Sequence, residues 1–172
     1  MARKGEGMSD YLAKVREILE EHHTIRSSVK LVGDSVSDQE ALVSLKDVRS
    51  DWTPGRLELV SEKQRNLKQT MSFLEEGLRN HFSREEEVLP QVLGEFLMRA
   101  LLSEHQEIEA AIGRVKAVAS VTKLEGMSQE ELMANDSELK QVVSSLSQLI
   151  EGHADKEDMM LEMVERALEA GK

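Results

Sequence analysis

The sequence predicts an all-α protein, folded as one four-helix bundle. The composition favours helices, because hydrophobic residues make up 40% and charged residues 32%, with only 2 prolines and 3% aromatic side chains to support strands. Four segments also repeat apolar residues every three or four positions, the period of an amphipathic helix. At 172 residues the chain is about one domain in size, and we expect residues 1–8 to form a flexible tail on it.

The first predicted helix covers roughly residues 9–32. Ser9 or Asp10 can cap its N-terminus, and His22 lies within its apolar stripe. A polar stretch follows from residue 33 to residue 51, and within it Ser37 and Glu40 have the spacing of a capping box. We therefore expect a short extra helix between the first and second helices of the bundle.

The other three predicted helices also carry a histidine in their apolar stripes. The second helix extends from Thr53, followed by a proline at the first helical position, to Pro90. The third covers roughly residues 95–119 and the fourth roughly residues 136–169. The fourth helix can start earlier, because Ser128 and Glu131 form a second capping-box pattern before it. The histidines in these stripes are His81, His105 and His153.

Charge and cysteine content exclude several classes of function. The net charge of -11 repels phosphate backbones and anionic lipids, so we expect no nucleic-acid or membrane partner. The absence of cysteine excludes disulfides, thiolate metal sites and thiol catalysis. No stretch reaches the roughly 18 apolar residues of a membrane span, and the N-terminus lacks the apolar run of an export signal. We expect a cytoplasmic protein, and the sequence identifies no protein partner.

Three of the four stripe histidines are followed by glutamate four residues later. A separation of four residues places both side chains on one face of a helix, so each pair points into the predicted core. One buried histidine is usually a hydrogen-bonded core residue, but several ionisable groups from four helices need a common partner, because burying them unpaired is costly. A metal ion is the simplest such partner, and these ligand types suit iron, manganese or zinc. The predicted ligands are His22, His81, Glu85, His105, Glu109, His153 and Glu157. We predict no catalytic residue, and we expect His23, which projects about 100° away from His22, to lie on the surface.

Four pieces of the sequence resemble the hemerythrin-like, or HHE cation-binding, family. They occur in the family's order across nearly the whole chain, and the most specific is His-Phe-x-x-Glu-Glu. The resemblance implies an up-down-up-down bundle that binds two iron ions about a bridging oxo or hydroxo group. It also implies that Glu85 and Glu157 bridge the ions and that the histidines are terminal ligands. The four pieces are Glu21–Arg26, His81–Pro90, Glu104–Glu109 and Gly152–Glu157.

Two departures from the oxygen-carrying hemerythrins affect the expected function. Those proteins have a second histidine four residues after the one in the third helix, where this chain has Glu109. An anionic ligand there should favour ferric iron and weaken reversible O2 binding. The carriers also have an aspartate five residues after the last histidine. Here Asp158 has that spacing, but it projects about 140° from His153 while Glu157 projects about 40°, so we choose Glu157 and keep Asp158 as the alternative.

The sequence therefore predicts a di-iron protein that responds to or handles O2, peroxide, NO or iron, and is not a reversible O2 carrier. The small ligand would be a molecule such as O2 or NO, and manganese or zinc could take the place of iron. One alternative is a di-iron enzyme such as a peroxide or NO reductase, which would need an electron donor. A second alternative is a structural bundle with adventitious metal.

Overall fold

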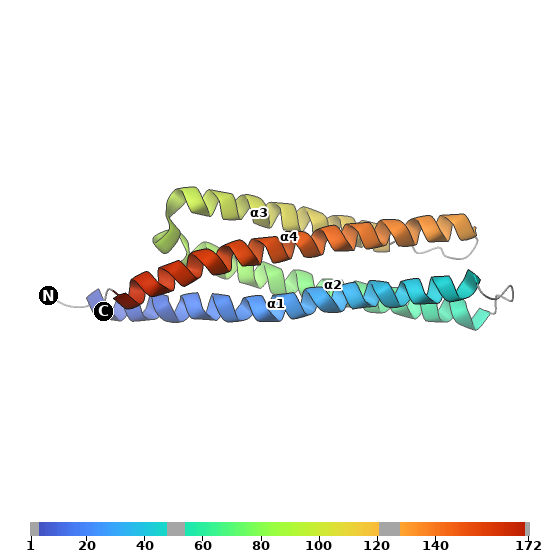
Figure 1. Cartoon of the computed structure of the whole chain (residues 1–172), viewed down its shortest axis with the longest axis horizontal. Coiled ribbons are helices and arrows are strands. Elements are labelled where there is room, and N and C mark those ends of the chain that lie inside the picture. The colour runs from blue at the N-terminus through green and yellow to red at the C-terminus, as the bar shows by residue number, and fades with distance from the viewer. Residues whose placement is uncertain (1–3, 48–53, 121–127, 171–172) are drawn as a thin grey trace.

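The computed structural model describes residues 4–47, 54–120 and 128–170, and within these ranges it contains helices and no strand. The helices are α1 (Lys4–Asp47), α2 (Pro54–Val88), α3 (Pro90–Ala119) and α4 (Gln129–Ala170). Consecutive helices run in opposite directions, and α1 begins at the end of the bundle where α4 finishes (Figure 1). Each helix packs against two neighbours, with α1 and α3 both lying between α2 and α4. The predicted all-α four-helix bundle is confirmed.

The buried positions along each helix alternate between steps of three and four residues. In α2, for example, the buried series runs Leu74, Leu78, His81, Glu85 and Val88. This spacing averages 3.5 residues and is typical of helices that pack side by side in a bundle. The apolar residues form two clusters, a larger one that includes Ile25 and Ile108 and a smaller one that includes Ile18 and Leu101. Between these clusters every helix contributes polar side chains, so a buried polar layer divides the core.

The helix ends follow local sequence signals. The capping box at the start of α4 forms, since the backbone N–H of Ser128 donates to Glu131 Oε2 at 2.7 Å and the N–H of Glu131 donates to Ser128 Oγ at 3.3 Å. This box explains why α4 begins at Gln129, earlier than residue 136. Near the start of α3, Gly94 has φ 75° and ψ 172°, a conformation that favours glycine, and the regular helix follows it from Glu95.

The predicted extra helix between the first two helices is wrong as a separate element. Residues 37–40 are helical, but they lie inside α1, which continues to Asp47. The helix passes through Gly33 because one interior glycine costs only about 1 kcal/mol and the buried Val32 and Val36 continue the apolar stripe across it. Residues 4–8, which the sequence assigned to a tail, also belong to α1. Among the described helices, none combines the length and apolar character needed to cross a membrane.

Candidate metal centre

The polar layer contains one buried histidine from each helix. His22, His81, His105 and His153 are each 3% exposed or less. One turn beyond the histidines of α2 and α4, Glu85 and Glu157 are fully buried in the same layer. The structure thus brings together all of the predicted ligands except Glu109.

The inward-facing atoms form two groups that share a carboxylate. Four residues supply the first group (His22, His81, Glu85, Glu157) and three supply the second (Glu85, His105, His153), with the ligand atoms of each group lying within 4.8 Å of one another. Oε1 of Glu85 is 2.5 Å from His81 Nε2, and its other oxygen, Oε2, is 3.1 Å from His105 Nε2. Oε2 of Glu157 lies 3.4 Å from Nε2 of both His22 and His153. Both carboxylates therefore lie between the two pairs of imidazoles.

Several of these inward-facing atoms lack a hydrogen-bond partner within the described ranges. They are both carboxylate oxygens of Glu85, both of Glu157, and Nε2 of His105 and His153. A buried polar atom without a partner costs about 1–3 kcal/mol, and more when it is charged. Imidazole nitrogen and carboxylate oxygen are suitable ligands for iron, manganese and zinc. The donor set therefore fits two adjacent divalent cations, which would give these atoms partners.

A second set of carboxylates holds the histidines from outside. Glu21 lies 2.8 Å from His81 Nδ1, and Glu104 lies 3.0 Å from His153 Nδ1. Glu86 contacts Nδ1 of His105 at 3.2 Å, and Asp158 contacts Nδ1 of His22. A carboxylate on Nδ1 fixes the ring with Nε2 available for a metal. We call these four residues (Glu21, Glu86, Glu104, Asp158) the outer carboxylates.

The outer carboxylates were absent from the predicted ligand set, although the sequence holds a signal for them. Each is the direct neighbour of a predicted ligand: two precede the histidines of α1 and α3, and two follow the glutamates of α2 and α4. Asp158 is one of them. Its side chain is 28% exposed and contacts Nδ1 of His22, whereas the side chain of Glu157 is buried within the layer.

Three ionisable groups in the layer have pKa values far from their usual ranges. Burial opposes a positive charge on His22, but the carboxylates close to it, Glu157 first, raise its pKa to about 10. Burial likewise opposes ionisation of Glu85, yet the surrounding imidazoles, His105 first, hold the pKa of Glu85 well below its usual range. For Glu157, burial is the main cause that raises the pKa to about 7. Without metal, protons therefore balance part of the negative charge in the layer, and metal ions would have to displace them.

Glu109 lies outside the layer, and the core spacing explains why. The buried series of α3 is Leu101, His105, Ile108 and Ile112, so the step after its histidine is three residues. In α2 and α4 the step after the histidine is four residues, and glutamate occupies the buried position. The i+4 pattern thus marks the inward face in two helices and a neighbouring, exposed face in the third. The predicted surface position of His23 agrees with the structure, where its side chain is exposed.

The family model described as the hemerythrin HHE cation binding domain matches residues 13–163, a range that contains the whole polar layer. No curated protein matches the chain.

Proposed function

The chain belongs to the hemerythrin HHE cation-binding domain family, and we propose that it holds a pair of iron ions in the polar layer and responds to or handles O2, peroxide, NO or iron through them. The observation that carries this proposal is the set of buried carboxylate oxygens and imidazole nitrogens that lack hydrogen-bond partners. Manganese and zinc accept the same ligand types, and iron is preferred because it adds redox chemistry to the site.

The arrangement of the carboxylates supports two ions over one. The two oxygens of Glu85 face different histidines, one from α2 and one from α3. Glu157 is equidistant from the histidines of α1 and α4. A carboxylate that lies between imidazoles from different helices can bridge two neighbouring cations. Other bundles hold two metals in this way on inward-facing Glu and His side chains.

The surroundings of Glu109 support a role other than reversible O2 transport. The sequence predicts Glu109 as an anionic ligand in place of the second histidine of the oxygen carriers. Because its side chain is exposed and outside both ligand groups, α3 supplies one imidazole and nothing else to the layer. Glu109 therefore adds no charge to the ligand set, and the proposed role outside reversible O2 transport rests on the second imidazole that α3 does not supply.

The chain's own residues provide binding, orientation and exclusion of water. The outer carboxylates orient the imidazoles, and apolar clusters close the layer on both sides along the bundle axis. A bound iron pair would supply two-electron ferrous to ferric chemistry in this enclosed layer.

Absorption spectroscopy tests the proposal. Iron-loaded protein exposed to air should show the near-ultraviolet band of an oxo-bridged ferric pair, and the band should change on addition of peroxide or NO. His23→Ala, which alters an exposed histidine, should give the same spectrum. A spectrum of isolated ferric ions would contradict the proposed pair. Sustained turnover of peroxide with an artificial reductant would instead favour the enzyme alternative.

A further inference from the structure

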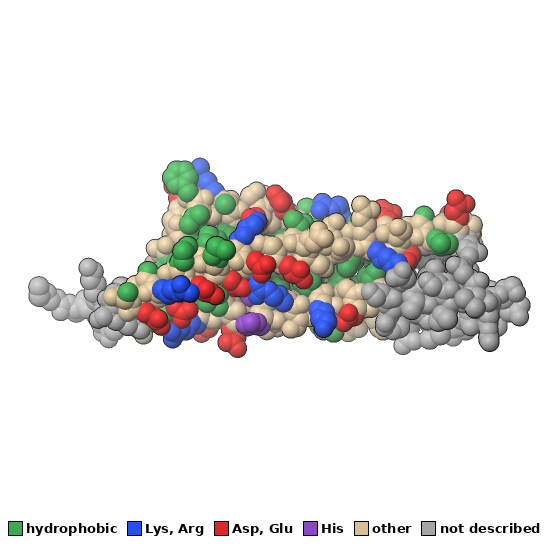
Figure 2. Space-filling view, in the orientation of Figure 1, with side chains coloured by type: hydrophobic (Ala, Val, Ile, Leu, Met, Phe, Trp, Pro, Cys, Tyr) green, Lys and Arg blue, Asp and Glu red, His purple; other side chains and the backbone are tan. Residues whose placement is uncertain are grey.

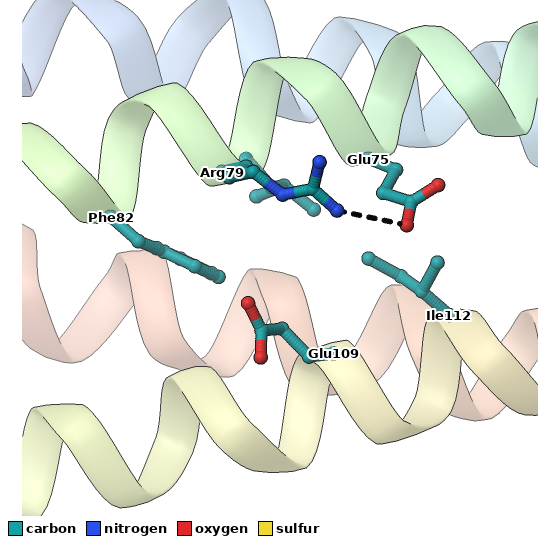
Figure 3. Close-up of a pocket in the computed structure, with 6 residues that line it drawn as sticks. Glu75, Arg79, Phe82, Glu109 and Ile112 are labelled. Carbon is teal, nitrogen blue, oxygen red and sulfur yellow. Dashed lines mark hydrogen bonds and ion pairs between the residues drawn. The ribbon is translucent and has the colours of Figure 1, made fainter.

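A pocket of about 190 Å³ lies between α2 and α3, beside the polar layer. Its lining is partly apolar and partly charged, and Figure 3 shows Phe82 of α2 and Glu109 of α3 facing each other across it. The lining residues are Glu75, Leu78, Arg79, Phe82, Glu109 and Ile112.

Phe82 belongs both to this pocket and to the wall of the polar layer. Its ring stacks on that of His105, with centroids 3.9 Å apart and an interplanar angle of 9°. The same ring meets His153 edge-on at 5.7 Å. Phe82 is 4% exposed, so it closes the layer on this side. The ring on which Phe82 stacks carries Nε2 of His105, which has no hydrogen-bond partner among the described residues.

Glu109 gives the pocket a free negative charge. The other carboxylate of the pocket, Glu75, is neutralised by Arg79 at 3.3 Å and by Lys116 at 2.7 Å. Within the described ranges Glu109 forms neither an ion pair nor a hydrogen bond, and its side chain is exposed. A free carboxylate at the mouth of a pocket raises the local concentration of cations.

The corresponding position on α1 has the opposite charge and is blocked. Arg26 lies four residues after His22, as Glu109 lies four after His105. Its guanidinium bridges Asp155 at 2.8 Å and Asp158 at 2.7 Å, which ties α1 to α4. This closed ion-pair network occupies the surface of the layer between α1 and α4, so among the described residues no comparable pocket carboxylate is left unpaired there.

We propose that metal ions reach the polar layer through the pocket between α2 and α3, where Glu109 receives the incoming cation and Phe82 moves aside to admit it. This inference rests on the proposed metal binding. Glu109 thus acts during uptake and is not a ligand of the bound metal.

Stopped-flow mixing of the full-length, metal-free protein with cobalt(II) tests this path. Glu109→Gln should slow uptake by about three- to tenfold at low ionic strength, and the difference should shrink at high salt. Glu107→Gln removes the same charge from an exposed position of α3 outside the pocket, and it should bind at the wild-type rate. Phe82→Leu should accelerate both uptake and release, because a smaller side chain closes the layer less completely. Because Glu109 is exposed, Glu109→Gln should fold normally. The uptake rate of that variant therefore still tests the path if Phe82→Leu fails to fold.

The final cobalt stoichiometry separates this inference from the proposed function. Normal stoichiometry with slower uptake in Glu109→Gln supports the path. Equal uptake rates for Glu109→Gln and wild type, at normal stoichiometry, overturn the path and leave the metal site standing. Loss of an ion in Glu109→Gln overturns it too, because Glu109 would then be a ligand. No cobalt bound by the wild type overturns the proposed function itself.

Discussion

Two helix–helix interfaces, or seams, flank the polar layer: α1 with α4, and α2 with α3. These seams differ from each other far more than the two halves of the layer between them do. Across the first seam Arg26 joins two aspartates, and Arg16 pairs with Glu165 and Glu169 at 2.6 Å each. Figure 2 shows acidic and basic side chains gathered along this face. Across the second seam lie the pocket, the closing ring of Phe82 and the free carboxylate of Glu109.

Inside these seams the layer is nearly two-fold repeated. In α1 and α3 a glutamate precedes the histidine, and in α2 and α4 a histidine is followed four residues later by glutamate and then by another acid. The contacts repeat as well, because each imidazole has a carboxylate on Nδ1 and faces the layer with Nε2. The two proposals therefore assign the holding of the metal and its admission to different residues. The inner residues repeat across the layer, whereas the outer seams differ: ion pairs close the first, and the second holds a pocket with the unpaired carboxylate of Glu109 among the described residues.

The largest expected effect comes from Glu85→Ala, because Glu85 is the residue that belongs to both ligand groups. Its removal should weaken binding of both ions by more than about a hundredfold, so the purified variant should carry almost no metal after desalting. Glu87→Ala, which alters an exposed acid on the same helix, should retain the wild-type content. Full metal content in Glu85→Ala would show that the two halves do not depend on a shared carboxylate.

Replacing a single histidine should have the next largest effect. His81→Ala removes an imidazole from the first group and should empty that half, while the second group keeps its three residues. His23→Ala changes an exposed ring and should leave the metal content unchanged. Elemental analysis of both variants checks this, and equal losses would mean that the inward and outward faces of these helices are misassigned.

Changes to the outer carboxylates should weaken metal binding without abolishing it. Glu104→Gln removes the charge that holds Nδ1 of His153, and it should lower metal affinity by about 10- to 100-fold while the stoichiometry at saturation is kept. Asp158→Asn should do the same through His22. Asp155→Asn provides a matched control, because Asp155 binds Arg26 and faces solvent. A competition assay with a chelator measures all three, and an equal loss in the control would remove the positioning role.

The smallest effect is the pH dependence of metal binding. The raised pKa values of His22, about 10, and Glu157, about 7, mean that both are largely protonated in the metal-free protein below about pH 7. Metal must displace these protons, so more protons should be released per ion at about pH 6 than at about pH 8, and affinity should fall as the pH is lowered. Calorimetry in buffers of different ionisation enthalpy measures the release. The same release at both pH values would contradict this charge pattern.

Much of the layer could be predicted from the sequence because helical periodicity reports which face a residue occupies. His81 with Glu85 and His153 with Glu157 fall on buried steps of four, and their histidines align with apolar stripes. Glu109 shows the limit of the same rule. A bundle alternates steps of three and four, and the predicted step of four after His105 is a step of three in the structure.

The contacts between helices could not be predicted in this way. Glu21 reaches His81 and Glu104 reaches His153, and both contacts depend on how far one helix is shifted along its neighbour. Periodicity within a single helix does not give that shift. The continuous α1 illustrates a related limit, since the capping-box pattern at Ser37 lies inside a helix whose apolar stripe had not ended.

The most direct test of the central claim is the metal content of the wild-type protein purified from iron-replete cells. Two ligand groups sharing Glu85 predict about two iron ions per chain by elemental analysis. A content below about one ion per chain, in protein that is folded and helical, would contradict a paired metal centre.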